Sequence, residues 1–325
     1  MKKENDKLIA ITGASGFIGS HLVNFMKDKG FRVRVLINKT DLKRDDVEKF
    51  YGSINNQKII KKFLENVNIV FHLASALGNR IISNEEFLNI NKNGTETLLK
   101  FAKERGVEKV VHFSSAGVYG KSSGLTPLKE DNILNPVDIY EKSKLEGEKI
   151  ALSYIDKLNI SIIRPGWAYG EGDRRTFKLI KQINSGLFFI VGKGNKLQSP
   201  IYIYDLIEAA YKIALKGGNG EIYNAGGTSI QIKKMVNQIA ESLKKKIIPF
   251  KMPLFLIYPP AFLLEKLFFF FDKEAPLTTS KLAFFIRGKP LNSDKLNNEL
   301  NAKPKTSFPE GIEKAIKWYK KMNWL

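Results

Sequence analysis

The sequence predicts an α/β fold: a doubly wound parallel sheet with a smaller C-terminal substrate-binding lobe. Short apolar, β-branched runs alternate with helical patterns through the first half of the 325 residues, which is typical of βαβ units. A glycine-rich turn follows the first apolar run, and loops rich in glycine and proline follow Pro165. We therefore expect a sheet domain over residues 1–165, with contributions from about residues 200–228, and a lobe formed mainly by residues 166–325.

The expected elements follow this alternation along the chain. Each strand is a short run of mostly β-branched or apolar residues, and each helix repeats apolar residues at spacings of three and four. Strands are expected over residues 8–12, 32–37, 69–73, 110–114 and 160–164. Helices are expected over residues 18–29, 91–104 and 137–158, with an amphipathic helix over 309–319.

Three glycines, Gly13, Gly16 and Gly19, lie between the first strand and the first helix. Without side chains, they let the backbone turn tightly and approach a pyrophosphate at the N-terminus of the helix. The spacing is G-x-x-G-x-x-G and not the common G-x-G-x-x-G, and an ordinary tight turn would look similar. Its position after the first strand nevertheless favours a Rossmann-type dinucleotide site.

Tyr140 and Lys144 are four residues apart on an expected helix, so both side chains lie on one face. A free tyrosine has a pKa of about 10 and is a poor base near neutrality. A neighbouring ammonium would stabilise the phenolate, and the same lysine can bond a nicotinamide ribose. Ser114 and Ser115 end a strand ahead of this helix, where a hydroxyl can hold a substrate oxygen. The pattern predicts proton transfer at an alcohol.

Composition excludes several other classes. The chain has no cysteine, which rules out disulfides, thiolate catalysis and cysteine-bound zinc, and permits a reducing cytoplasm. The three histidines lack metal-ligand spacing, so we expect no metal. The net charge of +20 comes from scattered lysines without an arginine-rich arm, so we expect a solvated surface and no nucleic-acid partner. The N-terminal residues lack the apolar core of a secretory signal, so we expect a cytoplasmic protein.

Taken together, these motifs resemble the extended short-chain dehydrogenase/reductases of the NAD-dependent epimerase/dehydratase family. The resemblance runs nearly from end to end of the chain. The matching segments are residues 12–19, 71–74, 91–95, 113–120, the Tyr140/Lys144 pair, and residues 164–170, 204–206 and 223–227.

The resemblance implies roles for particular residues. By analogy, Ser115 is the catalytic hydroxyl, Tyr140 the acid/base and Lys144 its partner, with Asn91 assisting near the active site. The implied cofactor is NAD(P). Its expected contacts are Gly13, Ser15, Gly16, Phe17, Ile18, Gly19, Asn38, Lys39, Leu73, Ala74, Ser75, Ser114, Tyr140, Lys144 and Pro165.

Three departures from the family pattern refine these expectations. Ala116 and Gly117 stand where sugar 4,6-dehydratases carry acidic residues after the catalytic hydroxyl, which argues against a dehydratase. The second strand ends at Ile37 and is followed by Asn38 and Lys39, without the acid typical of NAD-preferring members, so we favour NADP over NAD. Residues 52–54 also lack the aspartate that usually faces adenine.

The substrate clues point in two directions. Trp167 occupies a segment in which many nucleotide-sugar epimerases have an asparagine, while residues 276–278 and 311–319 are similar to the branch that includes 3β-hydroxysteroid dehydrogenases. The apolar residues 250–271 are broken by prolines and an ion pair, which argues against a transmembrane helix. We interpret them as lobe core or a homodimer contact, and leave open peripheral contact with a membrane that delivers a lipid-like substrate.

The function expected from these observations is an NAD(P)-dependent oxidoreductase that transfers a hydride at a secondary alcohol or ketone. The first alternative is a nucleotide-sugar epimerase that retains NAD through a complete cycle. The second alternative is a dinucleotide-sensing protein without turnover, although the Ser, Tyr and Lys set argues against it because a sensor needs no base. The small-molecule substrate would be a nucleotide sugar or a sterol-like or lipid-like alcohol.

Overall fold

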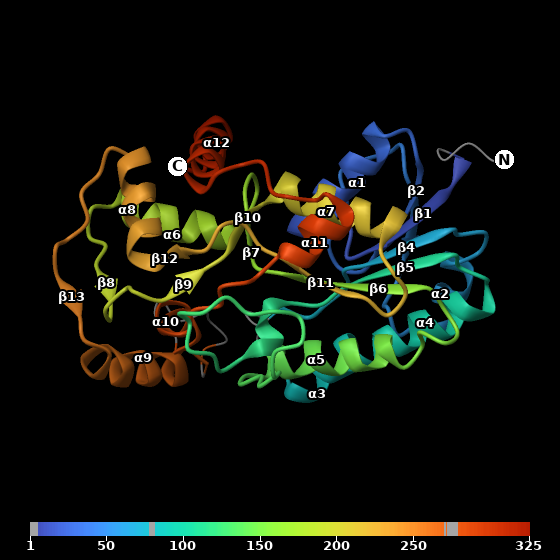
Figure 1. Ribbon diagram of the computed structural model, residues 1–325, viewed down its shortest axis with the longest axis horizontal. Helices are drawn as coiled ribbons and strands as arrows, with labels where there is room; N and C mark the ends of the chain where they lie inside the picture. The colour runs from blue at the N-terminus through green and yellow to red at the C-terminus, as the bar shows by residue number, and fades with distance from the viewer. Residues whose placement is uncertain (1–5, 78–81, 270, 272–278) are drawn as a thin grey trace.

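The computed structural model describes residues 6–77, 82–269, 271 and 279–325. Within them, a seven-stranded parallel sheet has the order β11-β6-β5-β4-β1-β2-β3, as the sequence predicts for a Rossmann-type fold (Figure 1). Its strands are β1 (Leu8–Thr12), β2 (Arg32–Ile37), β3 (Glu48–Tyr51), β4 (Ile69–His72), β5 (Lys109–Phe113), β6 (Ile160–Pro165) and β11 (Ile222–Ala225).

Helices cover both faces of the sheet. Figure 1 shows α1 (Phe17–Asp28) and α7 (Ile203–Lys216) on one face, with α2 (Gln57–Phe63), α4 (Gly94–Glu104) and α5 (Ile139–Leu152) on the other. Alternate residues of β1 enter two separate hydrophobic clusters: Ile9 and Ile11 belong to one, Leu8 and Ala10 to the other. Burial on both faces explains why the strand is continuously apolar.

The register aligns the carboxyl ends of the central strands. Thr12 at the end of β1 pairs with Leu36 of β2 on one side and with His72 of β4 on the other. The strand order reverses between β1 and β4, and this reversal places a crevice at the carboxyl edge where ligands bind in doubly wound sheets.

Most of the expected elements are confirmed, with corrections to the bounds of two helices. The helix expected over residues 137–158 is α5, which covers only Ile139–Leu152. The Asp138 carboxylate accepts a hydrogen bond from the Glu141 amide at 2.8 Å and begins the helix, and turns follow it from Ser153. The helix expected over residues 91–104 begins earlier, with the π-helical turn η2 (Asn89–Asn93) before α4.

The C-terminal lobe is built from short strands and several helices. Its parts are β7 (Trp167–Tyr169), α6 (Arg174–Asn184), β8 (Ile190–Val191), β9 (Leu197–Gln198), β10 (Pro200–Tyr202), β12 (Ile230–Gln231), α8 (Ile232–Ser242), β13 (Lys251–Met252), α9 (Leu254–Phe269), α10 (Thr279–Ile286), α11 (Asp294–Leu300) and α12 (Phe308–Lys321). Residues 200–228 contribute to both the sheet domain and the lobe. β10 pairs with β7 in the lobe, whereas β11 pairs with β6 in the main sheet and α7 packs on one face of that sheet.

The prolines expected to break the apolar segment do not break it. Pro259 and Pro260 lie inside α9, which continues to Phe269. Each proline removes only one donor, so the carbonyl groups of Phe255 and Leu256 lose their helical partners while the remaining turns persist. No helix in the described residues has both the length and the apolar character needed to cross a bilayer. Residues 276–278 lie outside the described residues.

Candidate active site

A cavity of about 500 Å³ opens at the carboxyl ends of β1, β2, β4, β5 and β6. Its lining includes every residue predicted from the sequence to contact the cofactor, Tyr140 and Lys144 among them. Ser115 and Asn91 are the predicted catalytic residues that do not line it. The further lining residues are Leu36, Thr40, Gly52, Ser53, Ile54, Asn55, Leu77, Glu86, Asn89, Ile90, Phe113 and Arg175.

The glycine turn forms the floor of this cavity and fits a pyrophosphate. Gly13 has a φ of +69°, and a Cβ there would lie 2.8 Å from the Ala74 amide nitrogen. A Cβ on Gly19 would lie 2.2 Å from the Gly13 carbonyl oxygen. A side chain at position 13 would therefore push the turn away from the loop after β4, and one at position 19 would push α1 away from the turn. No side chain caps the first turn of α1 at Gly16. Its amide groups are therefore directed to the cavity as an anion site.

A buried hydrogen-bond network holds the loop after β4. The Thr12 hydroxyl oxygen accepts bonds from the amides of Leu73 and Ala74 at 3.2 and 3.1 Å, and lies 2.8 Å from Nδ1 of His72. The other ring nitrogen of His72 lies 3.0 Å from the Thr95 hydroxyl. Burial, aided by the charge of Lys144, lowers the pKa of His72 to about 3. This histidine is neutral near pH 7 and shapes the cofactor wall.

The opposite end of the cavity is suited to an adenosine. Asn38 and Lys39, which follow β2, line it beside Ser53 and Asn55. Within the described residues, the Asn55 side-chain oxygen is buried without a hydrogen-bond partner. Because an unpaired buried acceptor is costly, a donor such as an adenine amino group would be well placed there.

Tyr140 lines the cavity, and its hydroxyl group is hydrogen-bonded to that of Ser115. Burial raises the pKa of Tyr140 above its ordinary value, while a hydrogen bond with Ser115 and the positive charge of Arg175 act to lower it. The Ser115 hydroxyl oxygen also accepts a bond from the Gly117 amide at 2.9 Å, at the start of η3 (Ala116–Tyr119). The two hydroxyl groups expected to share a substrate oxygen are thus held together before a substrate arrives.

Lys144 is nearly fully buried and points to the end of β5. Its ammonium donates to the Phe113 carbonyl at 2.5 Å. Burial lowers the pKa of Lys144 to about 8, although the charge of Glu148 opposes this effect. A hydrogen bond with Ser115 and the charge of Arg175 act to lower the pKa of Tyr140 in this structure, and the effect expected of Lys144 stays a prediction.

A buried ion pair fixes α5 to the sheet. Glu148 and Arg164 are both buried, and their side chains approach to 2.5 Å. The Ser114 hydroxyl donates to Glu148 at 2.5 Å, so it faces inward while its residue lines the cavity. Arg164 also donates to the Tyr119 hydroxyl at 2.8 Å. These charge-assisted bonds hold α5, and with it Tyr140, against β6 of the sheet.

Asn91 lies behind the cavity wall. Its side-chain oxygen accepts a bond from the Ala76 amide at 2.7 Å, and its amide group donates to the Ser143 hydroxyl at 2.8 Å. The Ser143 hydroxyl donates to the Tyr140 carbonyl at 2.9 Å. Asn91 therefore connects the loop after β4 to α5, the helix that carries Tyr140.

Two residues near the site were not predicted from the sequence. Arg175, in the first turn of α6, lines the cavity, and Lys289 of the lobe pairs with Glu141 beside Tyr140. For Arg175 the local signal is weak: the helix dipole opposes a cation in the first turn of α6, but the N-cap Asp173 lies 3.5 Å away and offsets this. Nothing in the local sequence marks Lys289.

Trp167 does not line the cavity. Its ring packs edge-on against Phe284 with centroids 5.2 Å apart, and it also contacts Tyr169 and Phe308. The tryptophan therefore helps to build the aromatic core of the lobe next to β6.

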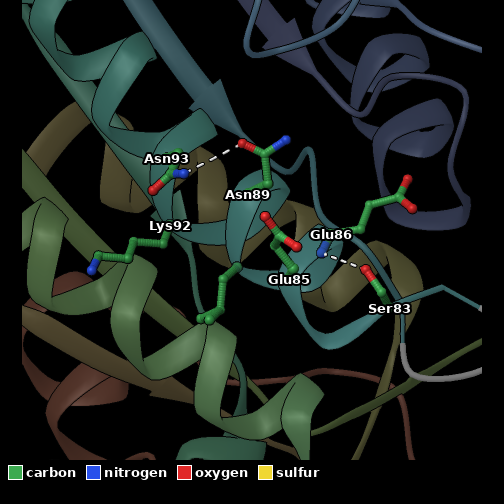
Figure 2. Close-up of a pocket in the computed structure, with 7 residues that line it drawn as sticks. Ser83, Glu85, Glu86, Asn89, Lys92 and Asn93 are labelled. Carbon is green, nitrogen blue, oxygen red and sulfur yellow. Dashed lines mark hydrogen bonds between the residues drawn. The ribbon is translucent and has the colours of Figure 1, made fainter.

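A second hollow, of about 410 Å³, adjoins the cavity at Glu86 and Asn89. Figure 2 shows its polar lining on α3 (Asn84–Leu88) and η2, including the bond from the Glu86 amide to the Ser83 hydroxyl at 3.1 Å. None of the residues predicted to bind the cofactor lines it. We therefore treat it as a surface feature beside the site.

The fold and this cavity are those of a nicotinamide-dinucleotide-binding protein. Residues 9–226 match the NAD dependent epimerase/dehydratase family. The chain belongs to this family and is an NAD-dependent enzyme of the dehydrogenase/reductase or epimerase kind.

Two relatives illustrate the range within the family. The chain is 27% identical to the N-acetyl-alpha-D-glucosaminyl-diphospho-ditrans,octacis-undecaprenol 4-epimerase of Escherichia coli O157:H7, over 77% of this chain and 76% of the relative. It is 24% identical to the 4-hydroxy-2-methyl-3-oxo-4-farnesyl-3,4-dihydroquinoline-1-oxide ketoreductase of Stigmatella aurantiaca, over 93% of this chain and 94% of the relative.

Solved structures share the fold along almost the whole chain. The crystal structure of gox2253 superimposes with a TM-score of 0.83 at 25% identity, covering 98% of this chain and 100% of the other. MoeE5, solved in complex with UDP-glucuronic acid and NAD, gives a TM-score of 0.77 at 24% identity, covering 97% and 99%.

Proposed function

We propose that this protein is an NAD(P)-dependent oxidoreductase that transfers a hydride at a secondary alcohol or ketone. The observation that carries the proposal is the interaction of Ser115 with Tyr140 at a cavity whose floor is the glycine turn. We assign residues 1–165, with parts of 200–228, to the cofactor and residues 166–325 mainly to the substrate.

Ser115 and Tyr140 handle the proton at the reacting oxygen. In alcohol oxidation, the Ser115 hydroxyl holds the substrate oxygen, and the Tyr140 phenolate accepts the proton as the carbonyl forms. The nicotinamide, when bound, supplies or accepts the hydride. In the reverse direction, the Tyr140 hydroxyl returns the proton to the new alcohol.

Lys144 and Asn91 support this chemistry in different ways. The Lys144 ammonium lines the cavity from a buried site and can turn from the Phe113 carbonyl to the nicotinamide ribose. Asn91 acts as a positioning residue, since its bonds to Ala76 and Ser143 fix the relation between the loop after β4 and the Tyr140 helix.

We propose that NADP is the preferred form of the cofactor. The adenosine end of the cavity presents Asn38, Lys39 and Thr40, and the carboxylate of nearby Asp41 does not line it. Asp41 instead accepts bonds from the Leu42 amide and the Lys49 ammonium. A 2′-phosphate would therefore meet a cation without a facing acid.

A nucleotide-sugar epimerase with retained NAD is the second candidate. Arg175 favours it, because this half-exposed cation at the cavity edge could meet a diphosphate. The relative named as an undecaprenol-diphospho-sugar 4-epimerase also favours this second candidate. The first candidate is favoured by the relative named as a ketoreductase, whose name contains farnesyl and suits a lipid-like ketone or alcohol. The Ser115–Tyr140 pair argues against a sensor without turnover.

Cofactor stoichiometry separates the two candidates. The protein is incubated with a panel of UDP-sugars, sterols and prenyl alcohols, each with either stoichiometric or trace NAD(P). An oxidoreductase changes one equivalent of cofactor per product, whereas an epimerase exchanges stereoisomers with a trace of cofactor. Exchange without net change in cofactor would replace the first candidate by the second.

A further inference from the structure

The outer face of α9 is exposed and apolar. Six of its side chains are between 45% and 74% exposed: Phe255, Leu256, Tyr258, Phe262, Leu263 and Leu267. Its inner side is buried at Ile257 and Ala261, which pack against Leu282 and Val191. The helix is therefore apolar on both sides, although only one side has a protein partner in the described residues. A patch of this kind usually marks an interaction site.

Charge identifies what would cover this face. Lys266 is exposed on α9, and its ammonium lies 5.2 Å from the ring centroid of Phe262. The nearby carboxylate of Glu265 is engaged by the amide and hydroxyl of Thr279 at 2.9 and 2.7 Å. The Glu265 carboxylate keeps its charge but faces Thr279, whereas the ammonium of Lys266 lies beside the exposed apolar side chains. A lysine whose stem follows apolar surface is typical of a membrane interface.

The wider charge distribution favours a negative partner. Residues 166–325 contain 26 lysines and arginines against 13 aspartates and glutamates, so they carry +13 of the total +20. Two copies of this positively charged lobe would repel each other, whereas an anionic bilayer would attract it. Figure 1 shows α9 along the edge of the lobe, at the opposite end of the molecule from β1 and β2.

The length of α9 decides how it would meet a bilayer. Its 16 residues include two prolines and fall short of the ~20 apolar residues that a spanning helix requires. The buried inner side also fixes the helix parallel to the lobe surface. A helix held in this way can lie in the headgroup region with one face in the lipid.

We propose that the outer face of α9 docks the protein on an anionic lipid bilayer. The exposed apolar side chains enter the headgroup boundary, and Lys266 with the net positive lobe meets the lipid phosphates. This docking does not rest on the proposed function, and it is measured without turnover.

Co-sedimentation with vesicles tests the proposal. The full chain is mixed with vesicles of phosphatidylcholine alone or of phosphatidylcholine and phosphatidylglycerol in equal parts. We expect binding to the anionic vesicles that weakens as salt is raised. The double variant Phe255→Ser/Leu263→Ser should reduce the partition coefficient by about tenfold or more. Both side chains are exposed, so the fold should be retained, which circular dichroism checks.

The matched control is Tyr51→Ser/Ile133→Ser, which removes two apolar side chains that are 58% and 88% exposed away from α9. This control should bind like the wild type. The proposal is overturned if the wild type does not bind anionic vesicles, or if the α9 variant binds them as well as the wild type does. It is also overturned if sedimentation shows a dimer that only the α9 variant dissociates, because a second copy would then occupy the face.

Discussion

Lys289 of the C-terminal lobe forms an ion pair with Glu141, the residue that follows Tyr140 on α5. The same ammonium lies 3.4 Å from the Gly117 carbonyl, and the other Glu141 oxygen accepts a bond from the Val137 amide at 2.8 Å. Lys289 therefore ties the lobe to both the start of α5 and the turn after Ser115.

We expect Lys289→Met to lower kcat by about tenfold, because Tyr140 and Ser115 lose part of their mutual orientation. Cofactor affinity should stay within about twofold, since Lys289 does not line the cavity. Lys295→Met, which breaks the pair with Glu221 elsewhere in the lobe, is the control. Steady-state kinetics and fluorescence titration measure the two quantities. An equal loss in both variants would make Lys289 a stability residue only.

Tyr140→Phe should lower kcat by at least about 100-fold, because only the proton-transfer hydroxyl is removed. Cofactor affinity should be nearly unchanged, since the ring still packs against the cavity. Tyr154→Phe, beyond the end of α5, should have wild-type rates. A smaller loss in the Tyr140 variant, measured at saturating substrate, would remove this residue from the acid/base role.

Lys144 should make stability depend on alkaline pH. Its pKa is about 8 in the folded protein and 10.5 ordinarily, so the unfolded state binds more protons between these values. The free energy of unfolding of the wild type should therefore rise by about 3 kcal/mol relative to Lys144→Met between pH 8 and 10.5. Urea unfolding at several pH values measures the difference, in which the other titrating groups largely cancel. A flat difference would mean that the lysine is not buried as a charged group.

Lys144 should also link cofactor binding to pH. If its ammonium bonds the ribose, affinity for the cofactor should fall as pH rises through about 8, and this dependence should be absent in Lys144→Met. Isothermal titration of wild type and variant measures it. Equal pH profiles would place the ribose contact elsewhere.

Lys39→Asp should shift the cofactor preference toward NAD, because a carboxylate would repel a 2′-phosphate and bond a ribose hydroxyl. We expect the ratio of the NADP and NAD dissociation constants to change by at least about tenfold. Lys43→Asp changes the same charge at an exposed position that does not line the cavity and should leave the ratio unchanged. A wild type that binds NAD more tightly would contradict the preference itself.

Arg175→Met should report on the substrate. For a substrate with a diphosphate, KM should rise by about tenfold or more, while an uncharged lipid-like alcohol should lose little. Arg174→Met is the control, since its guanidinium packs over Trp324 at 5.7 Å. Equal effects of the two substitutions would indicate a general charge effect.

The sequence alone determined the sheet and the cofactor turn, because these depend on local patterns. A strand buried on both faces must be continuously apolar, as in residues 8–12, and the close approach of the turn to Ala74 and to the helix requires glycine at positions 13 and 19. The Tyr140/Lys144 spacing likewise places both residues on one helix face before any packing is known.

Only the tertiary structure decided which distant groups act on these residues. Lys289 is 148 residues from Glu141, and no local pattern encodes that contact. The same is true of Lys144, whose ammonium is bonded by the Phe113 carbonyl, and of α9, whose periodicity is equally apolar on both sides. Burial and contacts across the chain decide electrostatics and exposure, so the pKa of Lys144 and the open face of α9 could not be predicted from the sequence.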